Sequence, residues 1–366
     1  MLYGHITELI GDTPLLRLDP ARHGLAGVEL YAKLESANPF GSVKDRVAAA
    51  MVAGVLDEMR AGGRTVVEAS SGNTAKALGV IAAMAGITVR AYTNRVRVAE
   101  MRDLLMLLEV DVHELPGLSE CPDPTAPNDV FGAIAELLER SPGRYVHTSQ
   151  YTSEVNIEAH YQGTGREIFD DIGQVDILVG GLGTTGSTRG AATFLREKNP
   201  ELRTVGVVST PADFIPGIRS AAEMWEVGLF QPDFYDAVVP VESAAAIDAS
   251  LELALRHGIL AGPTGGASYA AVKAFLAEQD VAERPLAVVF IVCDRLESYL
   301  SYYRQRRPEL FGRAARTRAA DLPDAEVAAA PAVGPAALAA ALDTDLVVDL
   351  RGGLAYRVGH VPGSVN

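Results

Sequence analysis

One lysine in this chain stands where its amine could act as a nucleophile. Lys44 lies within residues 38–46, and apolar residues recur behind it at helical spacing up to Met59. The pattern predicts a helix that begins close to Lys44. The positive end of the helix dipole and burial both disfavour an ammonium ion, so we expect an amine available for a Schiff base with an aldehyde. Taken alone, the segment is also compatible with a solvated lysine at a helix start.

A small polar turn supplies a second group of candidate residues. The sequence predicts a buried strand over residues 64–69 and a helix over residues 74–85, joined by residues 70–73. Backbone N–H groups and hydroxyls at such a helix start bind a carboxylate. The alternative is a simple helix cap, in which Ser71 or Asn73 accepts hydrogen bonds from the first turn.

A glycine-rich turn over residues 181–187 follows a strand predicted at residues 175–179 and precedes a helix predicted at residues 187–197. Its position at a helix start suits a phosphate dianion. Its glycines also match the G-x-G-x-x-G spacing of dinucleotide folds, but the next strand ends in Ser209 and Thr210, with no acid for a ribose hydroxyl. We therefore favour a small phosphate. A reactive amine, a carboxylate site and a phosphate site together describe an enzyme that uses pyridoxal 5'-phosphate (PLP).

Over about residues 3–305 the chain resembles the cysteine synthase and cystathionine β-synthase family of fold-type II PLP enzymes. The motifs that carry the resemblance stand in family order, at residues 10–15, 38–46, 70–74, 150, 181–190 and 262–266. The resemblance implies an α/β fold of the tryptophan synthase β type, with two α/β lobes and the cofactor in the cleft between them.

The resemblance also implies roles for individual residues. Lys44 would form the Schiff base, Asn73 would contact the ring hydroxyl, and Thr264 would face the pyridine nitrogen. The cofactor phosphate would be held by Gly183, Thr184, Thr185, Gly186 and Ser187. The substrate carboxylate would be bound by Ser70, Ser71, Gly72, Thr74 and Gln150. A hydroxyl cannot protonate the ring as an aspartate could, so loss of a β-substituent to give an aminoacrylate is expected over transamination.

One arginine bears on the substrate. Arg219 lies in residues 214–220, which resemble the substrate-facing loop of the O-phosphoserine-dependent branch. A guanidinium fork suits a phosphate leaving group, which a neutral acetyl ester does not need. A surface arginine at a helix start is the alternative.

The reaction predicted is therefore β-replacement on O-phosphoserine or O-acetylserine. Sulfide or a carrier-bound sulfur would act as nucleophile, and L-cysteine would be the product. Three alternatives remain open: an amine nucleophile giving a diaminopropionate-type product, elimination to pyruvate, and a non-catalytic regulatory or binding subunit.

Composition limits the possible partners. The net charge is −15 and no basic stripe is evident, which argues against nucleic acid or an anionic membrane as partner. No N-terminal signal is recognisable, so a cytoplasmic protein is expected. The predicted partners are a small amino-acid substrate, a second copy of the chain in a homodimer, and a sulfur-carrier protein. The only cysteines, Cys121 and Cys293, support neither a disulfide framework nor a metal site, and Cys293 is expected in the core.

Strands and helices alternate over residues 28–297, a pattern typical of parallel sheets covered on both faces. The resemblance divides the enzyme into a large PLP-binding lobe, residues 1–44 and 153–312, and a small mobile lobe, residues 45–152. An Ala/Pro-rich linker is expected over residues 313–341. Residues 342–366 resemble the opening of a rhodanese domain, without the segment that would carry its persulfide cysteine, so we expect no sulfur transfer by this part.

Overall fold

The computed structural model describes residues 2–53, 55–94, 96–115, 129–211, 213–279 and 284–312, together with Gly334, Pro335, Leu338, Ala339 and Val361. The chain separates into two units, Met1–Arg313 and Ala314–Asn366, and all elements named below belong to the first. The predicted linker and the rhodanese-like segment lie almost entirely outside the described residues, as does Cys121, so these interpretations stay predictions.

A six-stranded sheet has the strand order β1-β2-β10-β7-β8-β9. Every neighbouring pair is parallel except β1 and β2. The strands are β1 (Leu15–Arg17), β2 (Val28–Lys33), β7 (Ile177–Gly181), β8 (Arg203–Ser209), β9 (Ala237–Val241) and β10 (Leu286–Ile291).

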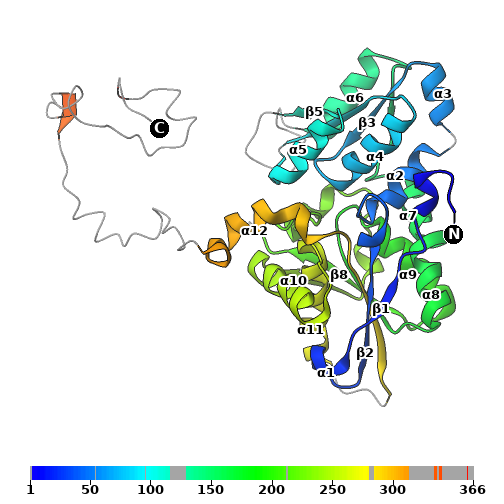
Figure 1. Cartoon of the computed structure of the whole chain (residues 1–366), viewed down its shortest axis with the longest axis vertical. Coiled ribbons are helices and arrows are strands. Elements are labelled where there is room, and N and C mark those ends of the chain that lie inside the picture. Colours follow the sequence, from blue (N-terminus) through cyan, green and yellow to red (C-terminus); the bar gives the residue numbers. More distant parts are fainter. Residues whose placement is uncertain are drawn as a thin grey trace. The chain divides into compact units, whose positions relative to one another are not determined.

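A separate four-stranded sheet is parallel throughout and has the order β5-β4-β3-β6. Its strands are β3 (Thr65–Ala69), β4 (Val89–Thr93), β5 (Asp111–Glu114) and β6 (Tyr145–His147). Figure 1 shows this sheet and its helices at one end of the first unit, with the six-stranded sheet at the other end. The α/β fold class expected from the sequence is confirmed.

Twelve α-helices connect and cover the strands of the described residues. They are α1 (Pro20–His23), α2 (Lys44–Val52), α3 (Leu56–Ala61), α4 (Asn73–Met84), α5 (Ala99–Leu107), α6 (Val130–Arg140), α7 (Glu154–His160), α8 (Arg166–Ile172), α9 (Gly186–Lys198), α10 (Ser243–His257), α11 (Pro263–Ala277) and α12 (Leu300–Arg306). Short helical turns include η1 (Ile6–Leu9), the π-helical η3 (Tyr161–Gly165), η4 (Ala221–Glu226) and η6 (Leu296–Tyr299).

The alternation of side chains along β7 explains why helices cover both faces of the larger sheet. Ile177 and Val179 point into the core cluster shared with α10 and α11, whereas Leu178 between them points into the cluster shared with α8 and α9. A further cluster joins the four-stranded sheet to α2, α4 and α5 and also receives Tyr299 and the two tyrosines of α12. Apolar packing on both faces of the sheet therefore holds the strand ends that carry the polar turns in place.

The helix behind Lys44 is shorter than the apolar spacing predicts. It ends at Val52, because Ala53 leaves the helical conformation with ψ 130°, and α3 begins separately at Leu56. Met59 therefore reaches the core from a second helix, and Val55 reaches it from the turn before that helix. The helix predicted to run from Lys44 to Met59 is thus two helices, since periodicity in apolar residues does not reveal a break between them.

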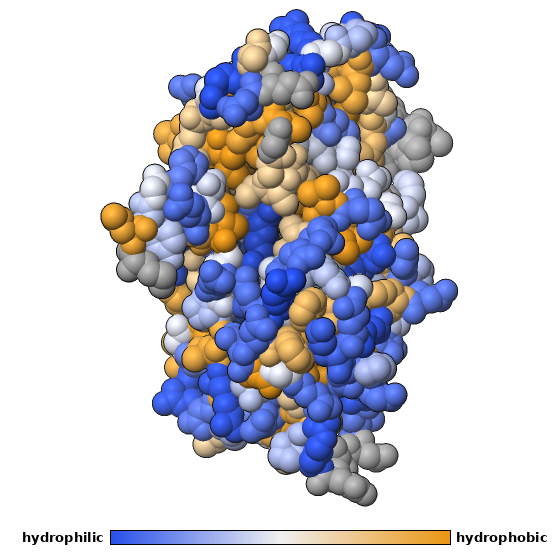
Figure 2. Space-filling model, turned by 90° about the vertical axis from the view of Figure 1, so that its right-hand side faces the viewer, coloured by the Kyte–Doolittle hydropathy of each residue, from blue (hydrophilic) through white to orange (hydrophobic). Residues whose placement is uncertain are grey.

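The face that carries the N-terminal end is mixed in polarity, and Figure 2 shows apolar residues gathered mainly in its upper half. Several large apolar side chains of the N-terminal stretch are exposed, namely Leu2, Tyr3, Ile6 and Leu9. Within the described part of the chain, no helix combines the length and apolar character needed to cross a membrane.

Candidate active site

All the predicted site residues except Gly186 line one cavity of about 370 Å³. Its walls come from the segments that follow the carboxyl ends of β3, β7, β8 and β10, where parallel α/β sheets commonly bind ligands. The lining includes Lys44, Ser70, Ser71, Gly72, Asn73, Thr74, Gln150, Gly183, Thr184, Thr185, Ser187, Arg219 and Thr264. Gly186 begins α9 immediately behind this wall.

Lys44 is the first residue of α2, and its Nζ lies 3.1 Å from the Thr184 hydroxyl. Burial lowers the pKa of the Lys44 ammonium, against the opposing effects of Cys293 and Glu68. The Cys293 thiol is buried beside it, and burial raises the pKa of that thiol, so it stays protonated. The amine is therefore the nucleophile that this part of the cavity offers.

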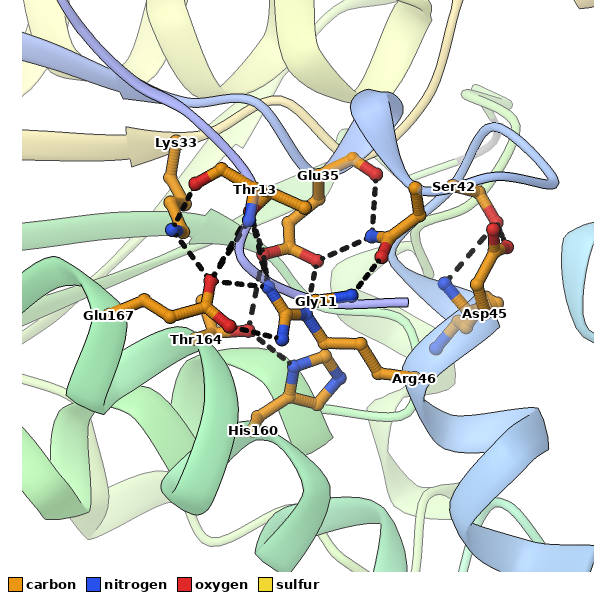
Figure 3. A network of polar contacts seen from close by, with 12 residues as sticks. Gly11, Thr13, Lys33, Glu35, Ser42, Asp45, Arg46, His160, Thr164 and Glu167 are labelled. Atoms are coloured by element: carbon orange, nitrogen blue, oxygen red, sulfur yellow. Dashed lines mark hydrogen bonds and ion pairs between the residues drawn. The ribbon is translucent and has the colours of Figure 1, made fainter. Parts of the chain in front are cut away.

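A buried ion network anchors the helix that carries Lys44 (Figure 3). The Arg46 guanidinium, two residues further along α2, pairs with Glu35 at 2.7 Å and with Glu167 at 2.6 Å. Lys33 of β2 also pairs with Glu167, at 2.8 Å. These cations hold the pKa of Glu167 at about 2 despite its partial burial. The network ties α2 to β2 and α8, which fixes the position from which Lys44 enters the cavity.

The N-terminal segment joins the same network. Thr13 donates its hydroxyl to Glu35 at 3.0 Å, and its main-chain carbonyl accepts from Lys33 at 2.6 Å. His160 lies at the edge of the network, with Nδ1 2.9 Å from the Thr164 hydroxyl. It is fully buried, and burial lowers its pKa well below the usual value, so it packs as a neutral ring.

The predicted carboxylate site is built around Gln150. Its side-chain oxygen accepts from the Thr74 hydroxyl at 2.7 Å, and its amide nitrogen donates to the main-chain carbonyl of Ala69 at 2.8 Å. Neither Ser71 nor Asn73 caps α4; the Ser70 hydroxyl instead accepts from the main-chain N–H groups of Gly72 and Ala75, at 3.3 and 3.2 Å. This site is therefore held in place by contacts within the protein.

Glu68 contacts the predicted carboxylate site through Gln150 and was not expected from the sequence. It is fully buried in β3, where its carboxyl accepts from the Thr148 hydroxyl and, at 3.1 Å, from the main-chain N–H of Gln150. Burial raises its pKa to about 7, although these hydrogen bonds oppose the shift. In the sequence Glu68 has the pattern of an interior strand residue, and nothing there indicates the partners that the segment after β6 supplies.

The glycine-rich turn before α9 has the features of an anion site. Thr185 adopts a left-handed conformation with φ +66°, and its buried hydroxyl has no hydrogen-bond partner within the described residues. No side chain caps α9, so its first N–H groups are available to a ligand. A Cβ on Gly183 would lie 2.6 Å from the carbonyl oxygen of Gly217, so only glycine fits this close approach.

Asn73 belongs to a polar cluster at the far wall of the cavity. Its Nδ2 donates to Asp294 at 2.7 Å and to the Tyr299 hydroxyl at 3.1 Å. Both amide hydrogens are used, so the buried Oδ1, which has no partner in the described structure, is the atom left for a ligand. Burial raises the pKa of Asp294 to about 6. The sequence analysis missed Asp294 and Tyr299, although an acid directly after the apolar run of residues 286–293 is a recognisable signal.

Thr264 and Arg219 also reach the cavity. The Thr264 hydroxyl is buried and donates to the Pro216 carbonyl at 2.6 Å, so it must turn to contact a ring nitrogen. The Arg219 guanidinium lies 5.2 Å from the centre of the Tyr151 ring and donates to its hydroxyl at 3.2 Å. Arg219 therefore forms part of the cavity wall, which disfavours the interpretation as an arginine unrelated to the site.

Comparison with known proteins identifies the class. The family model for pyridoxal-phosphate dependent enzymes matches residues 6–294. The chain is 32% identical to cysteine synthase B of Pseudomonas aeruginosa, over 82% of this chain and 96% of that protein. It is also 32% identical to N-(2-amino-2-carboxyethyl)-L-glutamate synthase of Cupriavidus metallidurans, over 82% and 89%. The crystal structure of cysteine synthase from Entamoeba histolytica superposes with a TM-score of 0.72 at 25% identity, covering 87% of this chain and 93% of that one.

The chain belongs to the family of pyridoxal-phosphate dependent enzymes. More narrowly, the resemblance to cysteine synthases and the fold-type II assignment are both confirmed, and PLP is the cofactor. The cavity fits this cofactor, because it offers one amine, an orphaned amide oxygen at Asn73 and an orphaned hydroxyl at Thr185 beside an uncapped helix N-terminus. Which residue contacts which part of PLP stays a prediction.

Proposed function

We propose that this enzyme catalyses β-replacement on O-phosphoserine and forms L-cysteine from sulfide or a carrier-bound sulfur. Lys44 would hold the cofactor, residues 183–187 its phosphate, and Ser70–Thr74 with Gln150 the substrate carboxylate. The proposal is supported by the likeness to cysteine synthases and by the charges of the cavity.

The observation that carries the choice of O-phosphoserine is the place of Arg219 in the cavity lining, in a chain of net charge −15. Lys44, Arg97, Arg219 and Arg306 line the cavity, against Asp213, Glu223 and Asp294. Arg306 is paired with Asp213 at 2.9 Å. Arg219 comes from the segment after β8 and presents a planar guanidinium, whose geometry matches phosphate. A phosphate leaving group is therefore better accommodated than an acetyl group.

When bound, PLP supplies the electron sink that allows the Cα proton and the β-substituent to leave. The protein's own residues would bind, orient and move protons around it. Lys44 is the positioned amine that would take the Cα proton, since burial favours its neutral form. Thr264 would contact the ring nitrogen without protonating it, which favours β-elimination over transamination. Closure over Ser70–Thr74 would exclude water and so limit hydrolysis to pyruvate.

An amine is the second candidate for the nucleophile. The relative from Cupriavidus metallidurans is named for a product that joins an aminocarboxyethyl group to glutamate, so an amine nucleophile is a reasonable alternative here. Arg97, an exposed residue of the cavity lining whose guanidinium lies 4.7 Å from the centre of the Phe214 ring, would contact the carboxylate of such a nucleophile. We retain sulfur as the first choice because cysteine synthases are prominent among the relatives and solved structures.

The protein is proposed to be a cytoplasmic homodimer. The surface proposed for association is formed by the exposed apolar side chains of the N-terminal stretch. A sulfur-carrier protein is proposed as the partner only if free sulfide proves a poor nucleophile.

The experiment compares kcat/KM for O-phosphoserine and O-acetylserine in the parent enzyme and in Arg219→Ala. We expect O-phosphoserine to be preferred, and Arg219→Ala to reduce its kcat/KM by about ten- to a hundredfold while O-acetylserine changes little. Arg203→Ala, which removes an arginine bonded to Gln279 away from the cavity, is the matched control. An equal loss for both donors would contradict the phosphate role. Testing sulfide, a thiocarboxylate and amines with the preferred donor then identifies the nucleophile.

A further inference from the structure

A buried asparagine that the proposed function does not use connects the two anion sites. Asn156 of α7 has no exposed surface, and its Nδ2 donates at 2.8 Å to the main-chain carbonyl of Gln150 and at 2.8 Å to the Thr184 hydroxyl. Gln150 belongs to the carboxylate site and Thr184 to the turn before α9. One amide group therefore contacts both walls of the cavity from behind.

The orientation of the Asn156 amide follows from its partners. The Gln150 carbonyl can only accept a hydrogen bond, so the NH₂ group must face it. The Oδ1 atom then lies against Gly186, where a Cβ would be 2.0 Å away, and it has no partner among the described residues. Because a side chain at position 186 would collide with this amide, Asn156 and the start of α9 are fixed against each other.

The same orientation determines what the Thr184 hydroxyl can do. A hydroxyl has one proton to donate and two lone pairs that accept. Asn156 Nδ2 fills one lone pair and cannot accept the proton, and Lys44 Nζ donates to the other lone pair at 3.1 Å, so the hydroxyl proton points to neither of them. Once Lys44 is engaged by the cofactor, the proton is left for an anion held in the turn.

We infer that Asn156 is a positioning residue for both anion sites: it directs the Thr184 hydroxyl toward the cofactor phosphate and holds the Gln150 backbone where the substrate carboxylate binds. The inference rests on the proposed placement of the phosphate at residues 183–187. Asn156→Asp keeps the shape of the side chain but replaces the donor by an acceptor. It would repel the Gln150 carbonyl, take the Thr184 proton and place a negative charge beside the phosphate.

The test removes the cofactor from the full chain and measures rebinding of PLP and of pyridoxal, which lacks the phosphate, by visible absorbance. Asn156→Asp is expected to weaken PLP binding by about ten- to a hundredfold while pyridoxal binding changes less than about twofold. The matched control is Asn199→Asp, because Asn199 Nδ2 also donates to a main-chain carbonyl, that of Val175 at 2.8 Å, away from the cavity. It should change neither affinity.

Three outcomes would overturn the inference or its basis. If Thr184→Val weakens PLP selectively but Asn156→Asp does not, Asn156 does not orient the hydroxyl. If Asn156→Asp weakens PLP and pyridoxal alike, its effect is a general loss of structure. If neither variant distinguishes PLP from pyridoxal, the phosphate does not lie in this turn and the proposed placement fails.

A second variant keeps the inference testable if Asn156→Asp does not fold. Asn156→Ala frees the Thr184 hydroxyl without adding charge, so a smaller loss selective for PLP is expected. Because Gln150 loses its backbone contact, the KM for the amino-acid donor should also rise by more than kcat falls. Unchanged KM together with unchanged PLP affinity would refute the positioning role.

Discussion

Replacing Arg46 by methionine tests whether the ion network of Figure 3 holds the Lys44 helix in place. The side chains of Glu35 and Lys33 are fully buried, and that of Glu167 is 16% exposed. Removing one partner of a buried ion pair costs about 3–5 kcal/mol, because the remaining charge stays in a poorly solvated site. We therefore expect Arg46→Met to lower the free energy of unfolding by about that amount.

The pH dependence gives a sharper magnitude. The network holds the pKa of Glu167 at about 2, against a usual value of 4.5. Each pKa unit corresponds to about 1.36 kcal/mol, so the full shift is worth about 3 kcal/mol. The loss in Arg46→Met is smaller, because Lys33 still lowers the pKa of Glu167 in the variant and because solvent screens the partly exposed carboxylate. A depressed carboxyl pKa stabilises the fold above pH 4.5, and this stabilisation is lost as the pH falls through 2. The difference between parent and variant should therefore shrink by roughly 1 kcal/mol from pH 7 to pH 3.5.

The assay is urea unfolding at both pH values, followed by circular dichroism and by the fluorescence of Trp225, the single tryptophan. Arg17→Met is the control, because Arg17 and its ion-pair partner Glu29 are both exposed, so about 1 kcal/mol or less is expected. Equal losses in the two variants would refute the importance of the network. If the difference in free energy of unfolding between the parent and Arg46→Met does not change with pH, Arg46 does not lower the pKa of Glu167.

Two further predictions concern the cavity walls. Gly183→Ala should abolish retention of PLP during gel filtration, because the added Cβ would lie 2.6 Å from the Gly217 carbonyl, and normal retention would contradict the close approach. Lys76 is buried in α4, and its ammonium lowers the pKa of Asp294, which stands at about 6. Lys76→Met should therefore raise that pKa and move the acid limb of the pH–rate profile to higher pH, whereas exposed Lys198→Met should leave the profile unchanged. An unshifted profile would rule out this electrostatic coupling.

The parts of the site that could be predicted from the sequence are those whose residues lie next to one another in the chain. The turns at residues 70–74 and 181–187 were recognisable because a buried strand, a small polar run and a helix follow one another directly. Predicted strand and helix limits around them differ from the observed limits by no more than two residues. These features depend on neighbours in the chain, and so periodicity and turn chemistry suffice to find them.

Other parts depend on contacts between residues far apart in the sequence. Glu68 obtains its partners Thr148 and Gln150 from the segment after β6, and Asn156 reaches the site only because α7 packs against α9. Arg46 stood within a recognised motif, but its pairing with Glu167 joins residues 121 positions apart. No spacing rule connects such residues, so their roles became visible only in the folded chain.

The most direct test of the account is to identify the lysine that holds the cofactor. Reducing the PLP-loaded enzyme with borohydride, digesting it and sequencing the peptides by mass spectrometry locates the modified side chain. We expect one phosphopyridoxyl group on Lys44 and none in Lys44→Ala, which should also lose the visible absorbance of the bound cofactor. Modification of Lys76 or another lysine, with Lys44 unmodified, would contradict this expectation.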